Sequence, residues 1–145
     1  MKALTLTQPW ASLYLTPRKR IETRSWPTRH RGSLAIHAAK GWTLADRKLA
    51  FMAGYATDEL PRAAVIGCIY LQDCLPITDN FTVGMPVEEI TWGNYAPGRY
   101  AWQRREFVFT FEPVPAKGAL GLWEWDWPSN FPHAAYTQWL SEVRQ

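Results

Sequence analysis

The sequence predicts an α+β domain: a small closed or partly open β-barrel with helices covering its ends. Three observations support this prediction. The predicted strands are short, and one carries a glycine that indicates a bulge, as small barrels often do. Eleven prolines and nine glycines are scattered along the chain, which indicates tight turns and no flexible linker. Three helices interrupt the strands without βαβ regularity, so a doubly wound parallel sheet is not expected.

The 145 residues are expected to form one domain, residues 1–145. A chain of this size buries about 68–70% of its unfolded surface, so it needs no disulfide or metal to fold. Cys68 and Cys74 lie in or beside one predicted strand, which would hold them roughly 20 Å apart, too far for a disulfide. We expect free thiols, no metal and no cofactor in a monomeric protein. The absence of a signal peptide and of an apolar run of about 18 residues indicates a cytoplasmic protein outside the membrane.

Residues 2–7 alternate between polar and apolar side chains and predict a short, half-buried strand. A short helix follows, with Pro9 in its first turn and Thr7 or Gln8 as its N-cap. Pro17 ends the helix. Because the helix is short, packing must stabilise it. The face that it buries is expected to comprise Trp10, Leu13 and Tyr14.

Residues 20–26 predict a second strand. Its period of two places four side chains on one face: Arg20, Glu22, Arg24 and Trp26. Two guanidinium groups bracket Glu22, so its carboxylate should stay ionised and orient Arg24. A fixed arginine loses less entropy when it grips a phosphate or a base edge. The alternative is a structural salt bridge on the barrel surface, because exposed ion pairs are common and nearly neutral in energy.

Residues 27–32 predict a turn rich in polar side chains: Thr28, Arg29, His30 and Arg31. Residues 33–39 predict a third strand, with Leu34, Ile36 and Ala38 on one face. His37 lies on the other face between small residues, which leave room beside it for a pocket. The alternative is a hydrogen-bonded structural histidine.

Residues 43–54 predict a helix capped by Thr43, with Asp46 three residues later as in a capping box. Its buried stripe is expected to comprise Ala45, Leu49, Met52 and Ala53. Residues 64–71 form a continuous apolar run that predicts a strand buried on both faces, with a bulge at Gly67.

The last third of the chain begins with an irregular stretch, residues 77–97, in which residues 87–90 predict a helical turn. Strands are expected at residues 99–102, 106–112 and 120–127. Phe107, Phe109 and Phe111 share one face of the second of these and favour core packing, because no ribonucleoprotein signature supports a base-stacking platform. Residues 131–143 predict a final helix with Ala135, Trp139 and Leu140 on its inner face.

Charge is distributed unevenly. Residues 18–48 hold nine basic residues against two acidic ones, whereas residues 58–89 hold six acidic residues against one basic residue. The net charge is only +3. A basic side on a nearly neutral body indicates a protein that binds phosphates, most simply those of a nucleic acid. The alternative is a solvated face that happens to be basic.

Residues 17–24, PRKRIETR, resemble G-x-K-x-x-E-x-R, the marker of the ASCH domain in the PUA-like superfamily. Lys19, Glu22 and Arg24 match the marker. Pro17 replaces its glycine, which stiffens the turn and removes a backbone N–H. Further segments resemble the cointegrator-type ASCH domains, so the resemblance covers almost the whole chain: QPWA, SWPTRHRG, IHA, VIGC, GRYAW and KGALGLW.

This resemblance implies a PUA-like β-barrel of five or six strands with helices at its openings. It also implies a cleft, lined by the marker residues, that holds RNA, single-stranded DNA or a nucleoside. The residues expected to bind nucleic acid are Gln8, Trp10, Lys19, Arg20, Glu22, Arg24, Trp26, Thr28, Arg29, His30, Arg31 and Lys40.

Binding is favoured over catalysis because the sequence lacks the G-x-S-x-G, H-E-x-x-H and deaminase zinc motifs. The alternative is a hydrolase in the same cleft, either a ribonuclease or an amidohydrolase acting on N4-acylated cytidine. Its catalytic residues would be Lys19, Glu22 and Arg24. The small hydrolases of the family carry threonine at the position of Glu22, so their mechanism does not transfer intact.

Lys19 would act as a base or nucleophile only if its pKa fell well below about 10.4. Strand parity places it on the face opposite Glu22 unless the turn before the strand rotates it. Neighbouring arginines favour a modest fall in the pKa, but we expect too little burial for a large one. We therefore expect a charged Lys19 that donates hydrogen bonds to a phosphate or a carbonyl.

Overall fold

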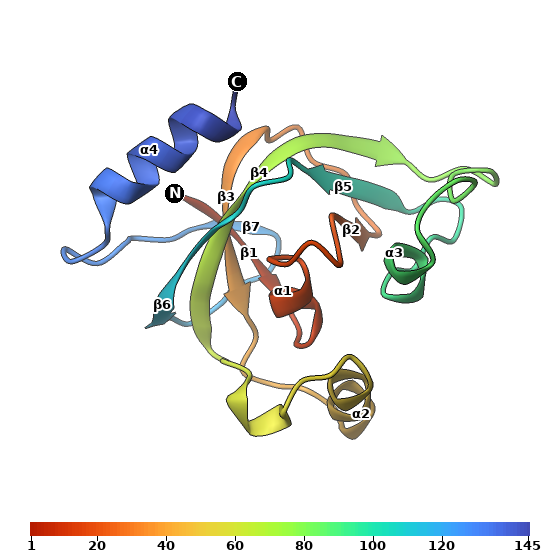
Figure 1. The fold of residues 1–145 in the computed structure, drawn as a ribbon, viewed down its shortest axis with the longest axis horizontal. Coiled ribbons are helices and arrows are strands. Elements are labelled where there is room, and N and C mark those ends of the chain that lie inside the picture. Colours follow the sequence, from red (N-terminus) through yellow and green to blue (C-terminus); the bar gives the residue numbers. More distant parts are fainter.

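One strongly bent mixed sheet of seven strands organises the chain (Figure 1). The computed structural model describes residues 1–145, apart from the side chain of Thr57. In chain order the elements are β1 (Lys2–Leu6), α1 (Trp10–Leu13), β2 (Ile21–Arg24), β3 (Gly32–Ala38), α2 (Leu44–Met52), the 3₁₀ helix η1 (Thr57–Glu59), β4 (Ala64–Pro76), α3 (Val87–Thr91), β5 (Tyr100–Arg104), β6 (Phe109–Pro115), β7 (Leu122–Glu124) and α4 (His133–Val143). The α+β class is thus confirmed.

The order of strands across the sheet is β2-β5-β4-β3-β1-β7, and β6 pairs with β4 beside this path. β1 and β3 run parallel. The other strand pairs are antiparallel. β2 and β7 are the two ends of the path, so a closed barrel is not confirmed. The strands also number seven rather than the five or six that the family resemblance implied.

β4 is the longest element, with 13 residues, and it extends well beyond the strand predicted for residues 64–71. Its first part pairs with β6 and its second part with β5. Between Val65 and Gly67 its register shifts against β6, so the bulge predicted there is confirmed. A Cβ at Gly67 would lie 2.8 Å from the carbonyl oxygen of Phe109. Cys68 and Cys74 on this strand are free thiols, as expected.

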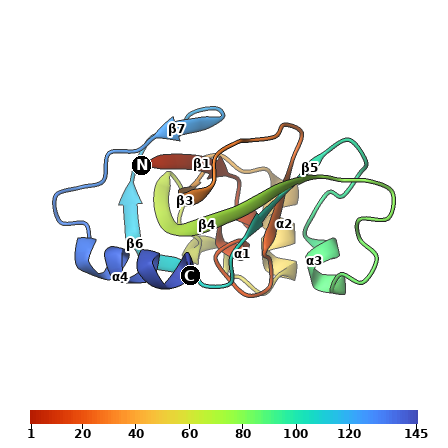
Figure 2. The same cartoon turned by 90° about the horizontal axis from the view of Figure 1, so that it is seen from above.

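Two apolar clusters pack against the sheet. The residues of β3 divide between them as predicted, with Leu34, Ile36 and Ala38 in the first cluster and Ala35 in the second. α1 covers the first cluster through the fully buried Tyr14 at its end. α4 covers the second cluster. Figure 2 shows α4 at one end of the molecule and α3 at the other, with α1 and α2 between them.

α1 begins differently from the prediction. Pro9 occupies the N-cap position, and the Gln8 side chain accepts a hydrogen bond from the Ser12 N–H at 3.0 Å. Leu13 is buried as expected, whereas Trp10 is only partly buried. Within the part of the chain that the structure describes, no helix has the length and apolarity needed to cross a membrane.

α2 carries the predicted capping box, in which Thr43 and Asp46 exchange side-chain and backbone hydrogen bonds of 3.0 and 2.8 Å. Its predicted buried stripe is wrong in part. Ala45 is exposed and Met52 is 74% exposed, whereas Ala50 is fully buried. The helix covers only a small cluster around Leu13, Ala53 and Trp92, and this narrow contact rotates its inner face.

β6 begins at Phe109, later than predicted for residues 106–112, and includes Pro113 and Pro115. Proline is tolerated here because β6 pairs with only one neighbour, β4. Phe109 and Phe111 belong to the core, as expected, but Phe107 precedes the strand and is 66% exposed. β7 is likewise shorter than the strand predicted for residues 120–127.

α4 packs through Tyr136, Trp139 and Val143, whereas the predicted inner residue Ala135 is exposed. Large aromatic rings decide this orientation. The rings of Tyr136 and Trp139 lie 5.9 and 5.8 Å from the ring of Phe109 on β6, centroid to centroid. An alanine at a neighbouring helical position has too little apolar area to compete with these contacts.

Candidate nucleic-acid interface

A cavity of about 340 Å³ lies between α1, α2, α3 and β2. We call it the Glu22 cavity, after the carboxylate in its wall. Its lining residues come from segments far apart in the sequence: Thr7, Trp10, Glu22, Thr23, Arg24, Asp46, Thr91, Trp92, Gly93, Asn94 and Arg99.

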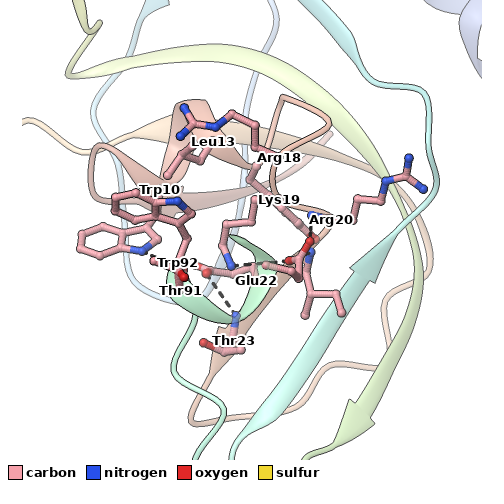
Figure 3. Close-up of polar contacts among 12 residues, drawn as sticks. Trp10, Leu13, Arg18, Lys19, Arg20, Glu22, Thr23, Thr91 and Trp92 are labelled. Atoms are coloured by element: carbon pink, nitrogen blue, oxygen red, sulfur yellow. Dashed lines mark hydrogen bonds and ion pairs between the residues drawn. The ribbon is translucent and has the colours of Figure 1, made fainter. Parts of the chain in front are cut away.

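Lys19 lies directly before β2 and is fully buried. Figure 3 shows its ammonium group beside the Glu22 carboxylate. Its Nζ atom lies 3.9 Å from Oε1 of Glu89 and has no hydrogen-bond partner among the described residues. Of the two alternatives, the structure has the one in which the turn before β2 rotates Lys19 toward Glu22. β2 begins only at Ile21, so strand parity does not extend back to Lys19.

Arg104 of β5 fixes the turn that carries Lys19. This arginine is 3% exposed. Its guanidinium donates hydrogen bonds to five carbonyl oxygens, those of Tyr14, Thr16, Lys19, Arg105 and Glu106. Three of these carbonyls belong to the segment between α1 and β2. The planar fork of an arginine can hold several acceptors at once, so Arg104 sets the path that turns Lys19 inward.

Glu89 on α3 holds the start of β2 through two backbone hydrogen bonds. Its Oε2 accepts a hydrogen bond from the Arg20 N–H at 2.8 Å, and its Oε1 accepts one from the Ile21 N–H at 2.9 Å. The glutamate is 6% exposed. The Lys19 ammonium thus lies in a buried region together with two carboxylates, those of Glu22 and Glu89.

Burial shifts the protonation equilibria of Lys19 and Glu22 in opposite directions. Burial lowers the pKa of the Lys19 ammonium, and the Glu22 and Glu89 carboxylates act against this shift. Burial raises the pKa of the Glu22 carboxyl, and the Lys19 and Arg24 cations act against it. The direction for Lys19 agrees with the prediction, but the expectation of little burial is wrong, and desolvation rather than neighbouring arginines is the main cause.

Two arginines supply positive charge to the Glu22 cavity. Nη1 of Arg24 lies 3.5 Å from Oε2 of Glu22, and its guanidinium lies 5.6 Å from the ring centroid of Trp26. Arg99 donates hydrogen bonds of 3.1 Å to the carbonyl oxygens of Thr23 and Asn94. Both guanidinium groups are thereby held in place beside the cavity.

The indole of Trp10 forms an apolar part of the cavity wall. Its Nε1–H donates a hydrogen bond to the Trp92 carbonyl oxygen at 3.1 Å, which fixes the ring between α1 and α3. Trp92 itself is 8% exposed. A fixed aromatic ring beside two guanidinium groups can stack on the flat face of a nucleobase.

The sequence profile of the ASCH domain matches residues 4–115. The chain belongs to the ASCH family. It is similar to Activating signal cointegrator 1 from Homo sapiens, with 36% identity over 133 residues that cover 85% of this chain and 22% of that protein. The Mus musculus protein of the same name is 38% identical over 82 residues, which cover 50% of this chain and 14% of that protein. The chain thus spans about a fifth or less of the length of these curated relatives.

Two crystal structures of ASCH from Zymomonas mobilis share the fold. The first has a TM-score of 0.57 and 16% identity, covering 98% of this chain and 94% of that one. The second, a point mutant, has a TM-score of 0.54 and 13% identity, covering 94% and 96%. At this level of identity the similarity concerns the fold alone.

The marker residues of the ASCH domain meet at the Glu22 cavity. Glu22 and Arg24 line it, and Lys19 lies behind Glu22 without lining it. Trp10 joins them from α1. Of the twelve residues predicted to bind nucleic acid, these four are the ones that the ASCH fold brings together here.

Three other predicted residues lie away from the cavity. Gln8 is fully buried, and its amide donates hydrogen bonds to Ser12 and to the Pro61 carbonyl oxygen. Arg20 points to the surface, where it lies 3.4 Å from Glu106. Trp26 packs edge-on against Trp102, at 4.8 Å between ring centroids.

The predicted turn residues mainly hold the turn itself. Arg31 donates hydrogen bonds to the carbonyl oxygens of Thr28 and His30 and lies 3.2 Å from Asp73. The His30 ring lies 2.9 Å from the Ser33 carbonyl oxygen. Arg29 is exposed. Lys40 lines a second cavity, of about 790 Å³, together with His37.

Several residues of the site were absent from the sequence prediction. They are Thr7, Thr23, Asp46, Glu89, Thr91, Trp92, Gly93, Asn94 and Arg99. Asp46 gave a signal, but only as a helix cap. The residues from Glu89 to Asn94 lie in the irregular part of the chain, where no periodicity indicates which side chains turn inward. Among the described residues, no group of three or more His, Cys, Asp or Glu is arranged to hold a metal.

Proposed function

We propose that this ASCH domain binds single-stranded nucleic acid, RNA or DNA, and that the Glu22 cavity receives one nucleotide of the strand. The observation that carries this proposal is the convergence of the marker residues on one cavity: Glu22 and Arg24 line it, and Lys19 supports Glu22 from behind. Membership of a family proposed to bind RNA supports the same reading, as does the similarity to a cointegrator protein.

The chemistry of the wall fits a nucleotide. Trp10 offers a stacking surface for a base. Arg24 and Arg99 offer donors for a phosphate or for acceptor groups of a base edge. Glu22 offers carboxylate oxygens that can accept a hydrogen bond from a base amino group. The volume of about 340 Å³ lies at the small end of ligand pockets, which suits one nucleotide unit rather than a duplex.

The proposal is tested with fluorescently labelled RNA and DNA oligonucleotides of mixed sequence, by anisotropy at several salt concentrations. Affinity should fall with salt, with a slope of about −0.7 per phosphate contact on a log–log plot. Arg24→Gln should weaken binding. Arg20→Gln is the matched control, because it removes the same charge from the same segment but outside the cavity. Absence of binding at low salt, or equal losses in the two variants, would refute the proposal.

We propose further that residues 1–145 fold as one unit, as the sequence predicted. The profile match ends at residue 115, yet α4 packs on the sheet through the second apolar cluster. Truncation before α4 should therefore expose Phe109, whose ring contacts Tyr136 and Trp139, and lower the stability of the remaining chain.

Hydrolysis is the second candidate function, and one observation favours it. The Lys19 amine is buried, has a lowered pKa and lacks a hydrogen-bond partner in the described structure. The neutral form of such an amine can accept a proton from water or a hydroxyl group during hydrolysis of RNA or of an N4-acylated cytidine. Binding ranks above it because Lys19 is fully buried and does not line the cavity.

The two functions are separated by incubating the protein with labelled RNA and with a panel of N4-acylated cytidines. Lys19→Met and Glu22→Gln are the informative variants, with circular dichroism as the check on folding. If the unmodified chain turns over a substrate and both folded variants do not, hydrolysis becomes the better account. If oligonucleotides bind and remain intact, the binding function stands.

A further inference from the structure

Two groups of cations in this chain differ in their partners. Five cations of the marker and turn segments have a carboxylate within 4.0 Å: Arg18, Lys19, Arg20, Arg24 and Arg31. A second group, around α2, has no ion pair among the described side chains: Lys40, Arg47, Lys48, Arg62 and Lys117. Carboxylates partly neutralise the first group, so the second supplies additional, unpaired positive charge that a polyanion can neutralise.

Trp42 organises part of this second group. Its ring lies 5.6 Å from the Arg47 guanidinium and 5.3 Å from the Arg62 guanidinium. Arg62 also donates a hydrogen bond of 2.7 Å to the Lys40 carbonyl oxygen. The Trp42 Nε1–H has no hydrogen-bond partner among the described residues. Two arginines are thus held on one indole without a carboxylate, and a guanidinium held in this way loses less entropy when it binds a phosphate.

We call Lys40, Trp42, Arg47, Arg62 and Lys117 the Trp42 surface. Lys40 and Lys117 stand at the second cavity, which Thr5, Ala39 and Leu120 also line. The exposed acids in this part of the chain are Asp58 and Glu59 on η1, and neither forms an ion pair with the Trp42 surface. Asp46 is occupied by the α2 cap.

The Trp42 surface adjoins the Glu22 cavity at two places. Asp46 lines that cavity, and Arg47 is the next residue along α2. Thr7, also in the cavity wall, follows Leu6, whose carbonyl oxygen accepts a hydrogen bond of 2.9 Å from the Ala39 N–H. Lys40 follows Ala39. The parallel pairing of β1 and β3 therefore places the chain at Thr7, in the cavity wall, beside the chain that leads into Lys40.

From these contacts we infer that a single-stranded nucleic acid held in the Glu22 cavity continues over the first turn of α2 and lays its phosphates on the Trp42 surface. This inference rests on the proposed function and extends it, because it assigns a direction and a second contact region to the bound strand. Arg47 and Arg62 bind phosphates, and Trp42 holds both guanidinium groups in position. The alternative partner is an acidic protein segment. Its carboxylates would contact the same cations, but it has no base to place in the Glu22 cavity.

The experiment compares a labelled dinucleotide, short enough for the Glu22 cavity alone, with a labelled twelve-nucleotide strand. The informative variant is Arg47→Gln with Arg62→Gln. The matched control is Arg20→Gln with Arg144→Gln, which removes the same two charges away from α2. Folding is checked by circular dichroism. A competition arm adds an excess of poly-glutamate to the twelve-nucleotide complex.

The α2 variant should bind the dinucleotide as the unmodified chain does. Its salt slope for the twelve-nucleotide strand should become less steep by about 1.4, which is two contacts at about 0.7 each. The control should leave the slope unchanged. A slope that changes equally in both variants, or a strand displaced by poly-glutamate as readily as by unlabelled oligonucleotide, would overturn the inference. If neither probe binds the unmodified chain, the proposed function fails as well.

Discussion

The Lys19 ammonium lies 3.9 Å from a carboxylate oxygen of Glu89, although the two residues come from segments 70 residues apart. The same glutamate accepts the backbone N–H groups of Arg20 and Ile21. α3 therefore closes over the start of β2 and confines the lysine between two buried carboxylates. The charge of Glu22 in the cavity wall therefore depends on Lys19, a buried residue that does not line the cavity.

Replacing Lys19 should make stability depend more strongly on pH. A carboxyl group whose pKa is raised by folding stabilises the protein fully at acid pH, and this contribution is lost as the pH rises through the folded pKa. Glu22 is such a group, and Lys19 is the strongest influence holding its pKa down. In Lys19→Met the Glu22 pKa should rise further, because its buried charge loses that partner.

The free energy of unfolding of Lys19→Met should thus fall progressively behind that of the unmodified chain as the pH rises from about 4.5. The loss should reach about 3–5 kcal/mol near pH 8, as for other broken buried ion pairs. Urea denaturation at a series of pH values measures it. Lys2→Met, which removes a partly exposed surface pair with Glu124, should show little change. Parallel pH profiles for Lys19→Met and the unmodified chain would contradict this account.

Arg104→Lys should destabilise the fold and disturb the site. A lysine keeps the charge but cannot reach five carbonyl oxygens from one position, so several buried acceptors lose their donors. We expect a loss of about 2–4 kcal/mol in the free energy of unfolding, measured by urea denaturation. Arg105→Lys is the control, because Arg105 donates to a single carbonyl oxygen, that of Val143. Equal losses of unfolding free energy in the two variants would show that the several hydrogen bonds of the Arg104 guanidinium do not add to stability.

Trp10 and Trp26 should respond differently to substitution. Trp10→Ala should weaken oligonucleotide binding by about 1–3 kcal/mol, because it removes a stacking surface from the cavity wall. Trp26→Leu should lower stability, because Trp26 packs against Trp102, and should weaken binding less than Trp10→Ala, because its ring acts on the cavity only through Arg24. Anisotropy titrations and urea denaturation measure the two effects. Full affinity in Trp10→Ala would exclude stacking on this ring.

Gly67→Ala should destabilise the sheet by about 1–3 kcal/mol, the usual range for overpacking. The new methyl group would lie 2.8 Å from the Phe109 carbonyl oxygen and 2.9 Å from a methyl group of Leu15. The backbone of β6 is paired to β4 at this point and cannot retreat freely. Gly41→Ala is the control, because nothing lies within 4 Å of its added methyl group. Thermal unfolding of both variants gives the comparison, and a stable Gly67→Ala would contradict the close packing at the bulge.

Local patterns in the sequence predicted features that depend on a single helix or strand. The two-residue period of β3 assigned Leu34 and Ile36 to one side of the sheet. The spacing of Thr43 and Asp46 determined the α2 cap, and Gly67 marked the bulge in β4. The predictions failed where an element meets a neighbour of unpredicted size, as in α4, where the large rings of Tyr136 and Trp139 occupy the interface and Ala135 is exposed.

The sequence by itself determined the family, through Lys19, Glu22 and Arg24, and the position of the short strand that carries two of them. Only the tertiary structure decided that Lys19 turns inward beside Glu22, because the carbonyl groups that orient it are bound by Arg104, far away in the chain. It also decided which cations are neutralised and which, like Arg47 and Arg62, are not. Burial and charge pairing depend on the distances between remote segments, and no local period in a sequence encodes those distances.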